Sequence, residues 1–169
     1  MDNIILIGMP GTGKSTVGVV LAKLLGYDFI DTDIVISNKE KRPLSQIIAE
    51  DGYNRFIEIE GEVGAELKCS RCVIATGGSM VFSENAMNNL KSLGTLVWLD
   101  TPLEVLEERL SKNMMERGVA TPRKMTVKEI FEVREPLYCR WSELRLHCRG
   151  DAEQVVEDLR KMLFGYQKA

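Results

Sequence analysis

Residues 8–15 read Gly-Met-Pro-Gly-Thr-Gly-Lys-Ser, and this run constrains the fold more than any other part of the sequence. A short stretch rich in β-branched residues, residues 3–7, comes directly before it. Apolar residues at helical spacing follow it over residues 15–25. A glycine-rich loop that ends in Lys-Ser, between a strand and a helix, is typical of a phosphate-binding loop. The context therefore predicts an α/β protein that binds a nucleoside triphosphate.

The residue types in this loop match the chemistry of phosphate binding. The glycines let the backbone curl, so that its N–H groups and the N-terminus of the following helix point at the phosphates. We expect Lys14 to bridge the β- and γ-phosphates and the hydroxyl of Ser15 to bind Mg²⁺. ATP is thus the predicted co-substrate and Mg²⁺ the predicted cofactor. The predicted nucleotide-binding residues of the loop are Gly8, Gly11, Thr12, Gly13, Lys14, Ser15 and Thr16.

Short apolar runs alternate with helical patterns along the rest of the chain. The apolar runs are residues 3–7, 27–30, 72–75, 95–99 and 144–148, and the helical patterns are residues 15–25, 44–50, 54–69, 85–93, 103–110, 126–141 and 152–164. Strands that are apolar on both faces need cover on both faces, so we predict a parallel sheet between two layers of helices, in a single domain over residues 1–169. Residues 112–124 lack apolar periodicity, and we predict that they form a mobile segment.

Composition narrows the possible partners. The net charge is −3 and basic residues are interspersed with acids, which argues against binding to nucleic acid or to an anionic membrane surface. No signal peptide or membrane-spanning run is recognisable, so we expect a cytoplasmic protein. Cys69 and Cys72 form a CxxC pair, but with one histidine in the sequence a zinc site is poorly supported, and we interpret these residues as reduced thiols.

The length of the chain bears on the class of nucleotide-dependent protein. A chain of 169 residues has no room for the second subdomain of a motor ATPase. It also lacks an NKxD sequence, which a GTPase uses to recognise guanine. A small-molecule kinase, which moves the γ-phosphate of ATP to a hydroxyl group, is the remaining interpretation, and we expect it to be a monomer.

Two acids follow the second predicted strand, in the sequence Asp31-Thr-Asp33. At the carboxyl end of a parallel strand they would face the phosphates, where Asp31 could bind a water of Mg²⁺ and Asp33 could accept the proton of an attacking hydroxyl. A pair of acids in this pattern is more often a helix cap. The phosphate-binding loop makes the catalytic interpretation the stronger one here.

Four motifs together resemble the shikimate kinase family along most of the chain. They are the loop at residues 8–15, Asp31-Thr-Asp33, the sequence Ala-Thr-Gly-Gly at residues 75–78, and Arg-Glu-Pro-Leu-Tyr at residues 134–138. The resemblance implies a three-layer fold like that of nucleoside monophosphate kinases, with a five-stranded parallel sheet. It also implies a small substrate-binding region around residues 32–60, a mobile lid around residues 112–124, and transfer to the 3-hydroxyl of shikimate.

The same resemblance implies roles for individual residues. Arg134 would bind the carboxylate of the substrate, a group that the planar guanidinium fits well. Arg109 would pack on adenine, and Arg117 would reach the transferring phosphate from the lid. The predicted catalytic residues are therefore Lys14, Asp33 and Arg117, the predicted substrate-binding residues are Asp33, Gly77, Gly78 and Arg134, and the predicted metal ligands are Ser15 and Asp31.

The sequence departs from the family pattern on the acceptor side. Ile57 follows Phe56 where the family has an arginine that forms a second clamp on the carboxylate. Ser79 stands in place of a third glycine, and residues 116–119 lack the usual lid sequence. These departures leave two alternatives open: a kinase of a different small alcohol or polyol, or a catalytically weak nucleotide-binding regulator.

Overall fold

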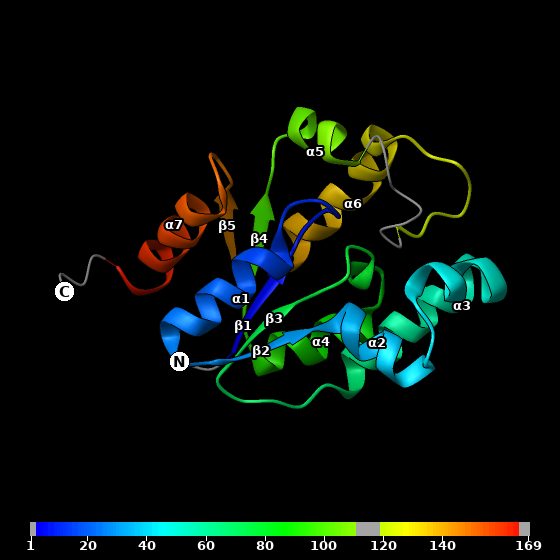
Figure 1. Cartoon of the computed structure of the whole chain (residues 1–169), viewed down its shortest axis with the longest axis horizontal. Helices are drawn as coiled ribbons and strands as arrows, with labels where there is room; N and C mark the ends of the chain where they lie inside the picture. Colours follow the sequence, from blue (N-terminus) through cyan, green and yellow to red (C-terminus); the bar gives the residue numbers. More distant parts are fainter. Residues whose placement is uncertain (1–2, 111–118, 166–169) are drawn as a thin grey trace.

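The computed structural model describes residues 3–110 and 119–165 of the chain. Its secondary structure alternates strands with helices, as the sequence pattern predicts (Figure 1). The strands are β1 (Asn3–Ile7), β2 (Asp28–Asp31), β3 (Cys72–Ala75), β4 (Gly94–Asp100) and β5 (Leu144–His147). The helices are α1 (Lys14–Leu25), α2 (Thr32–Glu40), α3 (Leu44–Glu66), α4 (Glu84–Leu93), α5 (Leu103–Leu110), α6 (Val127–Trp141) and α7 (Ala152–Phe164), with a 3₁₀ turn at Met80–Phe82.

The five strands form one sheet in the order β2-β3-β1-β4-β5, and every neighbouring pair is parallel. The central strand β1 pairs with both β3 and β4, so that Ile5 lies opposite Ile74 on one side and Leu96 on the other. Its five residues are all buried. The prediction of a five-stranded parallel sheet is therefore confirmed.

Alternate residues of β1 point to opposite faces of the sheet, and each face has its own hydrophobic core. Ile5 and Ile7 belong to a cluster with Trp98 and with apolar residues of α4 and α6. Ile4 and Leu6 belong to a second cluster, with apolar residues of α1 and α7. The fold thus has three layers, with the sheet in the middle (Figure 1).

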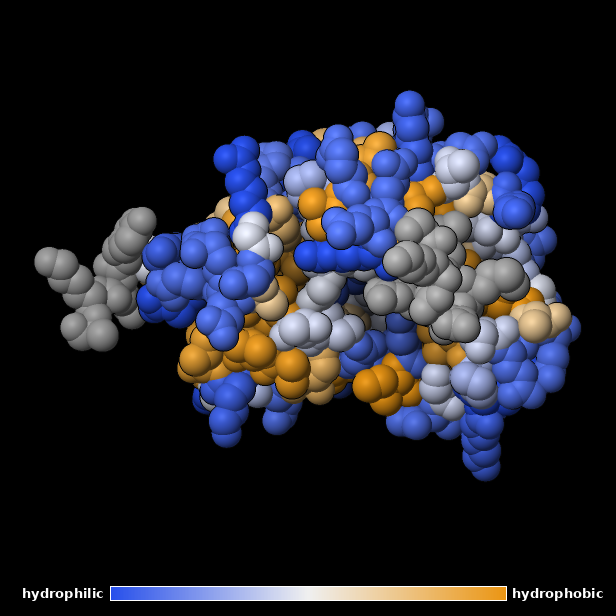
Figure 2. All heavy atoms as spheres, turned by 45° about the horizontal axis from the view of Figure 1, so that its top comes forward, coloured by the Kyte–Doolittle hydropathy of each residue, from blue (hydrophilic) through white to orange (hydrophobic). Residues whose placement is uncertain are grey.

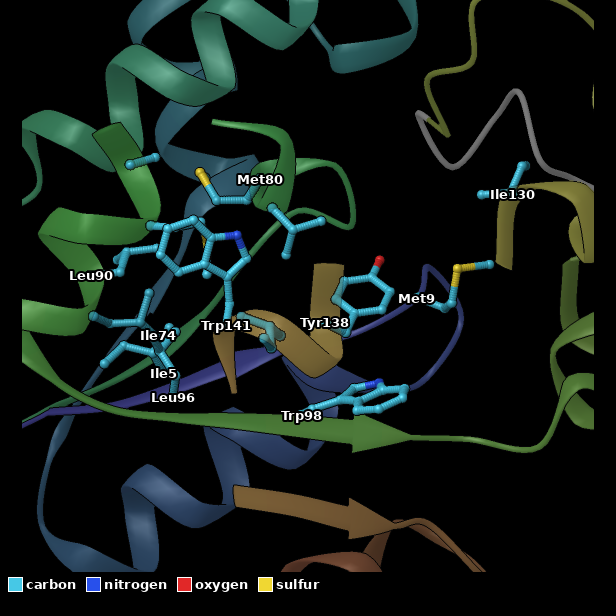
Figure 3. Packing of buried hydrophobic residues seen from close by; sticks show 14 of the residues in the cluster. Ile5, Met9, Ile74, Met80, Leu90, Leu96, Trp98, Ile130, Tyr138 and Trp141 are labelled. Atoms are coloured by element: carbon cyan, nitrogen blue, oxygen red, sulfur yellow. The ribbon is translucent and has the colours of Figure 1, made fainter. Parts of the chain in front are cut away.

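Aromatic side chains fill the first of these cores (Figure 3). The rings of Trp98 and Tyr138 have centroids 5.9 Å apart, and both residues are fully buried. Trp141 of α6 lies in the same cluster. Hydrophilic residues cover most of the face shown in Figure 2, as expected when apolar side chains gather inside.

A third, smaller core lies under the region that the sequence assigns to substrate binding. It joins α2 to α3 through Ile36, Ile47, Phe56 and Ile59, and Ala120 packs into it from the segment before α6. This small core holds α3 beside the carboxyl ends of the strands, where the ligand site of a parallel sheet is expected.

The helices differ from the prediction in two places. Residues 32–40 form α2, a helix that the sequence pattern did not predict. The predicted interruption between residues 44–50 and 54–69 is confirmed, because Gly52 forms a kink inside α3 and its φ of 82° and ψ of 170° are not helical. The second half of α3 ends at Glu66, so the prediction that it reaches residue 69 is wrong. Leu67 is already extended there, and the carbonyl of Cys69 accepts a hydrogen bond from Asn3 on β1 instead of continuing a helix.

The predicted lid falls partly outside the described residues. Residues 119–124 are described, whereas Arg117 and the preceding part of the segment are not. In the part of the chain that the structure covers, no helix combines the length and apolar character needed to cross a membrane.

Candidate active site

The loop between β1 and α1 requires glycine at two of its positions. Gly8 has a φ of 143°, and a β-carbon there would stand 2.7 Å from the carbonyl oxygen of Leu99. Gly13, with a φ of 89°, is the N-cap of α1 and has no side chain that could accept a hydrogen bond from the helix. The first N–H groups of α1 are therefore left to point into the loop, which is the arrangement that binds phosphate.

Lys14 lies buried under this loop. Its Nζ donates hydrogen bonds to the carbonyl oxygens of Gly8 and Met9, both at 2.8 Å. Burial lowers the pKa of Lys14 to about 8, against the opposing effect of the carboxylate of Asp33. The ammonium is thus still predominantly protonated at neutral pH, and its charge is held at the place where the phosphates are predicted to bind.

Ser15 and Asp31 meet at the carboxyl end of β2. The hydroxyl of Ser15 donates to Oδ2 of Asp31 at 2.5 Å, while Oδ1 of Asp31 accepts from the backbone N–H of Asp33 at 3.0 Å. Asp31 is therefore the N-cap of α2, as the alternative interpretation of the Asp-Thr-Asp sequence expects. The cap uses one carboxylate oxygen, and the other lies beside the Ser15 hydroxyl. Two adjacent oxygens of this kind are the donors that Mg²⁺ prefers.

Asp33 does not act as a cap. Its Oδ1 is buried and has no hydrogen-bond partner among the described residues. Burial raises the pKa of Asp33 to about 6, helped by the negative charge of Asp31 and opposed by Lys14. A buried carboxylate oxygen without a partner is costly, and a pKa in this range suits a group that takes up a proton near neutral pH.

One cavity of about 340 Å³ is lined by Lys14, Asp33, Gly77, Gly78 and Arg134, whereas the predicted catalytic residue Arg117 lies outside the described residues. Its charged lining residues are Lys14, Asp33, Glu60 and Arg134, supplied by α1, α2, α3 and α6. The remaining lining residues are Pro10, Gly11, Gly13, Ser15, Thr16, Phe56, Thr76, Gly77, Gly78, Ser79, Val119 and Ala120. Segments far apart in the sequence thus form a single site at the carboxyl ends of the strands.

Arg134 is held rigidly in the wall of this cavity, 3% exposed. Its Nη2 donates to the carbonyl oxygen of Ala120 at 2.8 Å, and the guanidinium lies 5.6 Å from the centre of the Phe82 ring. No carboxylate of the described residues forms an ion pair with it. A buried guanidinium without an anionic partner is ready to bind an anionic ligand.

The two glycines after β3 leave room for close approach. A β-carbon on Gly77 would stand 2.1 Å from Oε1 of Glu60 and 2.9 Å from Oδ1 of Asp33, so a side chain there would collide with both. A β-carbon on Gly78 would lie 3.0 Å from Nη1 of Arg134. The hydroxyl of Tyr138 donates to the carbonyl of Gly78 at 2.6 Å and fixes this turn.

A second cavity, of about 470 Å³, opens on the other side of the loop. Arg109 lines it and donates to the carbonyl oxygen of Gly11 at 2.9 Å, and Thr12 and Thr16 lie in the same wall. The packing of Arg109 on adenine stays a prediction from the family resemblance. Arg149, which the sequence did not single out, also lines this cavity.

Glu60 lines the first cavity although no sequence pattern predicted it, and Ser79, which the sequence marks only as a departure from the family pattern, lines it too. Both are buried, and the hydroxyl of Ser79 donates a hydrogen bond to Oε2 of Glu60. Burial raises the pKa of Glu60 to about 7. The available signal was the position of Glu60 four residues after the buried Phe56, which places both side chains on one face of a helix.

Ile57 is not among the residues that line the first cavity. It lies in a shallow hollow with Gly61 and Ser83.

Comparisons with known proteins agree with this geometry. The sequence model of the shikimate kinase family matches residues 10–164. A shikimate kinase from Persephonella marina is 35% identical over 161 residues, which cover 94% of this chain and 97% of that protein. One from Thermosynechococcus vestitus is 39% identical over 166 residues, covering 95% and 89%.

Solved structures give the same result. Shikimate kinase from Acinetobacter baumannii in complex with shikimate superposes with a TM-score of 0.83 at 28% identity, covering 99% of this chain and 96% of that one. Shikimate kinase from Aquifex aeolicus superposes with a TM-score of 0.79 at 34% identity, covering 96% and 99%. Fold, sequence and site geometry therefore agree that this chain is an ATP-dependent kinase with a hydroxyl acceptor and belongs to the shikimate kinase family.

Proposed function

We propose that this kinase transfers the γ-phosphate of ATP to a hydroxyl of shikimate. The observation that carries the proposal is the single cavity that holds Lys14, Asp33 and Arg134. Lys14 marks the phosphate end and Asp33 marks the reacting hydroxyl. Arg134 supplies an unpaired cation for the carboxylate at the other end of the acceptor, and the relatives of this chain include a shikimate kinase solved with shikimate bound.

The proposed reaction forms a bond between the acceptor oxygen and the γ-phosphorus and breaks the bond from that phosphorus to the β-bridging oxygen of ATP. Asp33 takes the proton of the attacking hydroxyl, which its pKa of about 6 allows near neutral pH. Lys14 stabilises the charge that develops on the phosphate oxygens, and ADP leaves. Arg134 and the backbone beside Gly77 and Gly78 orient the acceptor.

Magnesium fits the donor set at the end of β2. We infer that the hydroxyl of Ser15 and Oδ2 of Asp31 hold Mg²⁺, directly or through water. When bound, Mg²⁺ supplies positive charge to the phosphates. The role of Arg117 as a second cation at the transferring phosphate remains a prediction from the family resemblance, and so do the closing lid, the monomeric state and the cytoplasmic location.

The test is a measurement of ADP production with shikimate and with other small alcohols and polyols, in the presence and absence of Mg²⁺, with the phosphorylated product identified by ³¹P NMR. We expect ADP formation that requires both shikimate and Mg²⁺. Turnover of another alcohol but not of shikimate would favour a different acceptor. This is the second candidate, because Arg134 is the one arginine among the described residues that line the cavity. Nucleotide binding without turnover of any acceptor would favour a regulator.

A further inference from the structure

Glu60 lies deep in the acceptor cavity, beside the proposed catalytic base. It is 1% exposed and comes from the second half of α3. Its Oε1 and Oδ1 of Asp33 stand 2.1 and 2.9 Å from the same point, the place where a β-carbon on Gly77 would lie, so these two oxygens are within about 5 Å of each other. When the acceptor places its reacting hydroxyl at Asp33, the substituent on the adjacent carbon atom therefore lies close to Glu60.

The charge of Glu60 has no cationic partner among the described residues. Its one hydrogen-bond partner there is the hydroxyl of Ser79, and no ion pair includes it. Three charged groups face it from other elements: Asp33 from α2, Lys14 from α1 and Arg134 from α6. Lys14 is bound to carbonyls of the phosphate loop, and Arg134 is bound to the carbonyl of Ala120. Neither cation is within ion-pair distance of Glu60.

The position from which the protein could supply a cation is apolar. Residues three apart on a helix are neighbours, so a basic side chain at residue 57 could reach Glu60. Ile57 stands there, and it packs against the small core of α2 and α3. Glu60 is thus a buried carboxylate for which the described residues supply no compensating positive charge. Burial raises its pKa to about 7, so a proton can neutralise it near neutral pH.

A purely structural role does not explain the carboxylate. A glutamine would accept the hydrogen bond of Ser79 equally well and would avoid the cost of a buried charge. A carboxylate is favoured over an amide where a ligand brings a positive charge, because an ion pair with it is strong when water is excluded. At a pKa of about 7, Glu60 ionises with little cost when such a ligand arrives.

We propose that Glu60 is a specificity residue for the acceptor, and that this site prefers an acceptor with an amino group next to the hydroxyl that is phosphorylated. The ammonium pairs with Glu60, the hydroxyl with Asp33 and a carboxylate with Arg134. The inference rests on the proposed transfer to a hydroxyl of a small carboxylic acid, and it adds a substituent to that substrate class.

A matched pair of acceptors tests the proposal: shikimate, and the analogue in which an amino group replaces the 4-hydroxyl, next to the hydroxyl that is phosphorylated. Affinity for each is measured by calorimetry with the full chain, and kcat/KM by ADP production. We expect the wild-type protein to favour the amine by about tenfold, the difference between a charge-assisted and a neutral hydrogen bond. Glu60→Gln should bring the ratio to about one.

Two further variants control for unrelated effects. Glu62→Gln changes an exposed glutamate of the same helix, paired with Arg55 outside the cavity, and should leave the preference unchanged. Ile57→Lys supplies the missing cation from the protein and should abolish the preference. The melting temperature of each variant shows that it folds.

The outcomes separate this inference from the proposed function. Turnover of shikimate with equal affinity for the two compounds, or a preference for the amine that survives Glu60→Gln, would overturn the inference alone. Preferential binding of the amine without turnover of either compound would overturn the proposed function and support the role of Glu60. Absence of binding by both compounds would overturn both.

Discussion

Asp33→Asn should lower turnover and at the same time stabilise the ligand-free protein. Burial raises the pKa of Asp33 from 3.8 to about 6. An acid whose pKa is higher in the folded than in the unfolded state destabilises the fold at a pH above both values, because the folded state then holds a charge that it disfavours. A shift of about two units corresponds to about 3 kcal/mol. The neutral asparagine should remove up to this cost at about pH 8.

Thermal unfolding of both proteins over a range of pH checks the stability effect. For a chain of this length, 3 kcal/mol corresponds to about 6 to 12 °C. The difference should shrink as the pH falls through about 6 and vanish near pH 4, where Asp33 is protonated in the folded state and becomes protonated in the unfolded one. Turnover should fall by about 10² to 10⁴, with ATP affinity near that of the wild type. A variant that is destabilised at pH 8, or that turns over normally, would refute this account of Asp33.

Three further predictions concern other parts of the site. Lys14→Met should abolish transfer and leave the fold intact, because the lysine charge acts on the phosphates; normal turnover in a folded variant would contradict the phosphate-loop assignment. Hydrogen exchange in residues 112–124 should slow when nucleotide and acceptor are both bound, and unchanged exchange would count against a lid. Ile57→Arg should lower the KM for shikimate by about thirty-fold or more, with little change in the KM for ATP. A wild-type KM for shikimate already in the micromolar to low-millimolar range would show that no second clamp is needed.

The sheet and the phosphate loop could be predicted because their signals are local. The apolar run at residues 72–75 is too short for a helix and ends at two glycines, which indicates a strand covered on both faces, and the structure has β3 at these residues. The loop residues lie within one short stretch whose spacing is set by phosphate geometry. Asp33 and Gly77 line the cavity because they follow β2 and β3, whose carboxyl ends meet at one edge of the sheet, whereas Arg134 reaches it from α6.

The missed features arise from contacts between distant segments. A glutamate on a helix is usually exposed, so the spacing of Glu60 from Phe56 is a weak signal of burial, and its partner Ser79 is 19 residues further on. The interruption at Gly52, by contrast, could be predicted. A glycine between two helical patterns predicts an interruption of the helix. The two halves of α3 stay packed together because Ile47 from the first half and Phe56 and Ile59 from the second belong to the same small core.

The departures at Ile57 and Ser79 are best understood together, because both concern Glu60. An arginine at residue 57 would lie one helical turn from Glu60 and would compensate its charge, while a glycine at residue 79 would offer it no hydroxyl. With isoleucine and serine at these positions, Glu60 keeps one neutral hydrogen bond and loses the cation. The described residues of the cavity offer no second arginine in exchange.

Any positive charge that compensates Glu60 must then come from a proton, from the acceptor, or from the segment that carries Arg117. The Ile57→Arg and Glu60→Gln variants distinguish these sources: if Arg117 supplied the charge, Glu60→Gln would alter the affinity for shikimate and for its amino analogue by the same factor.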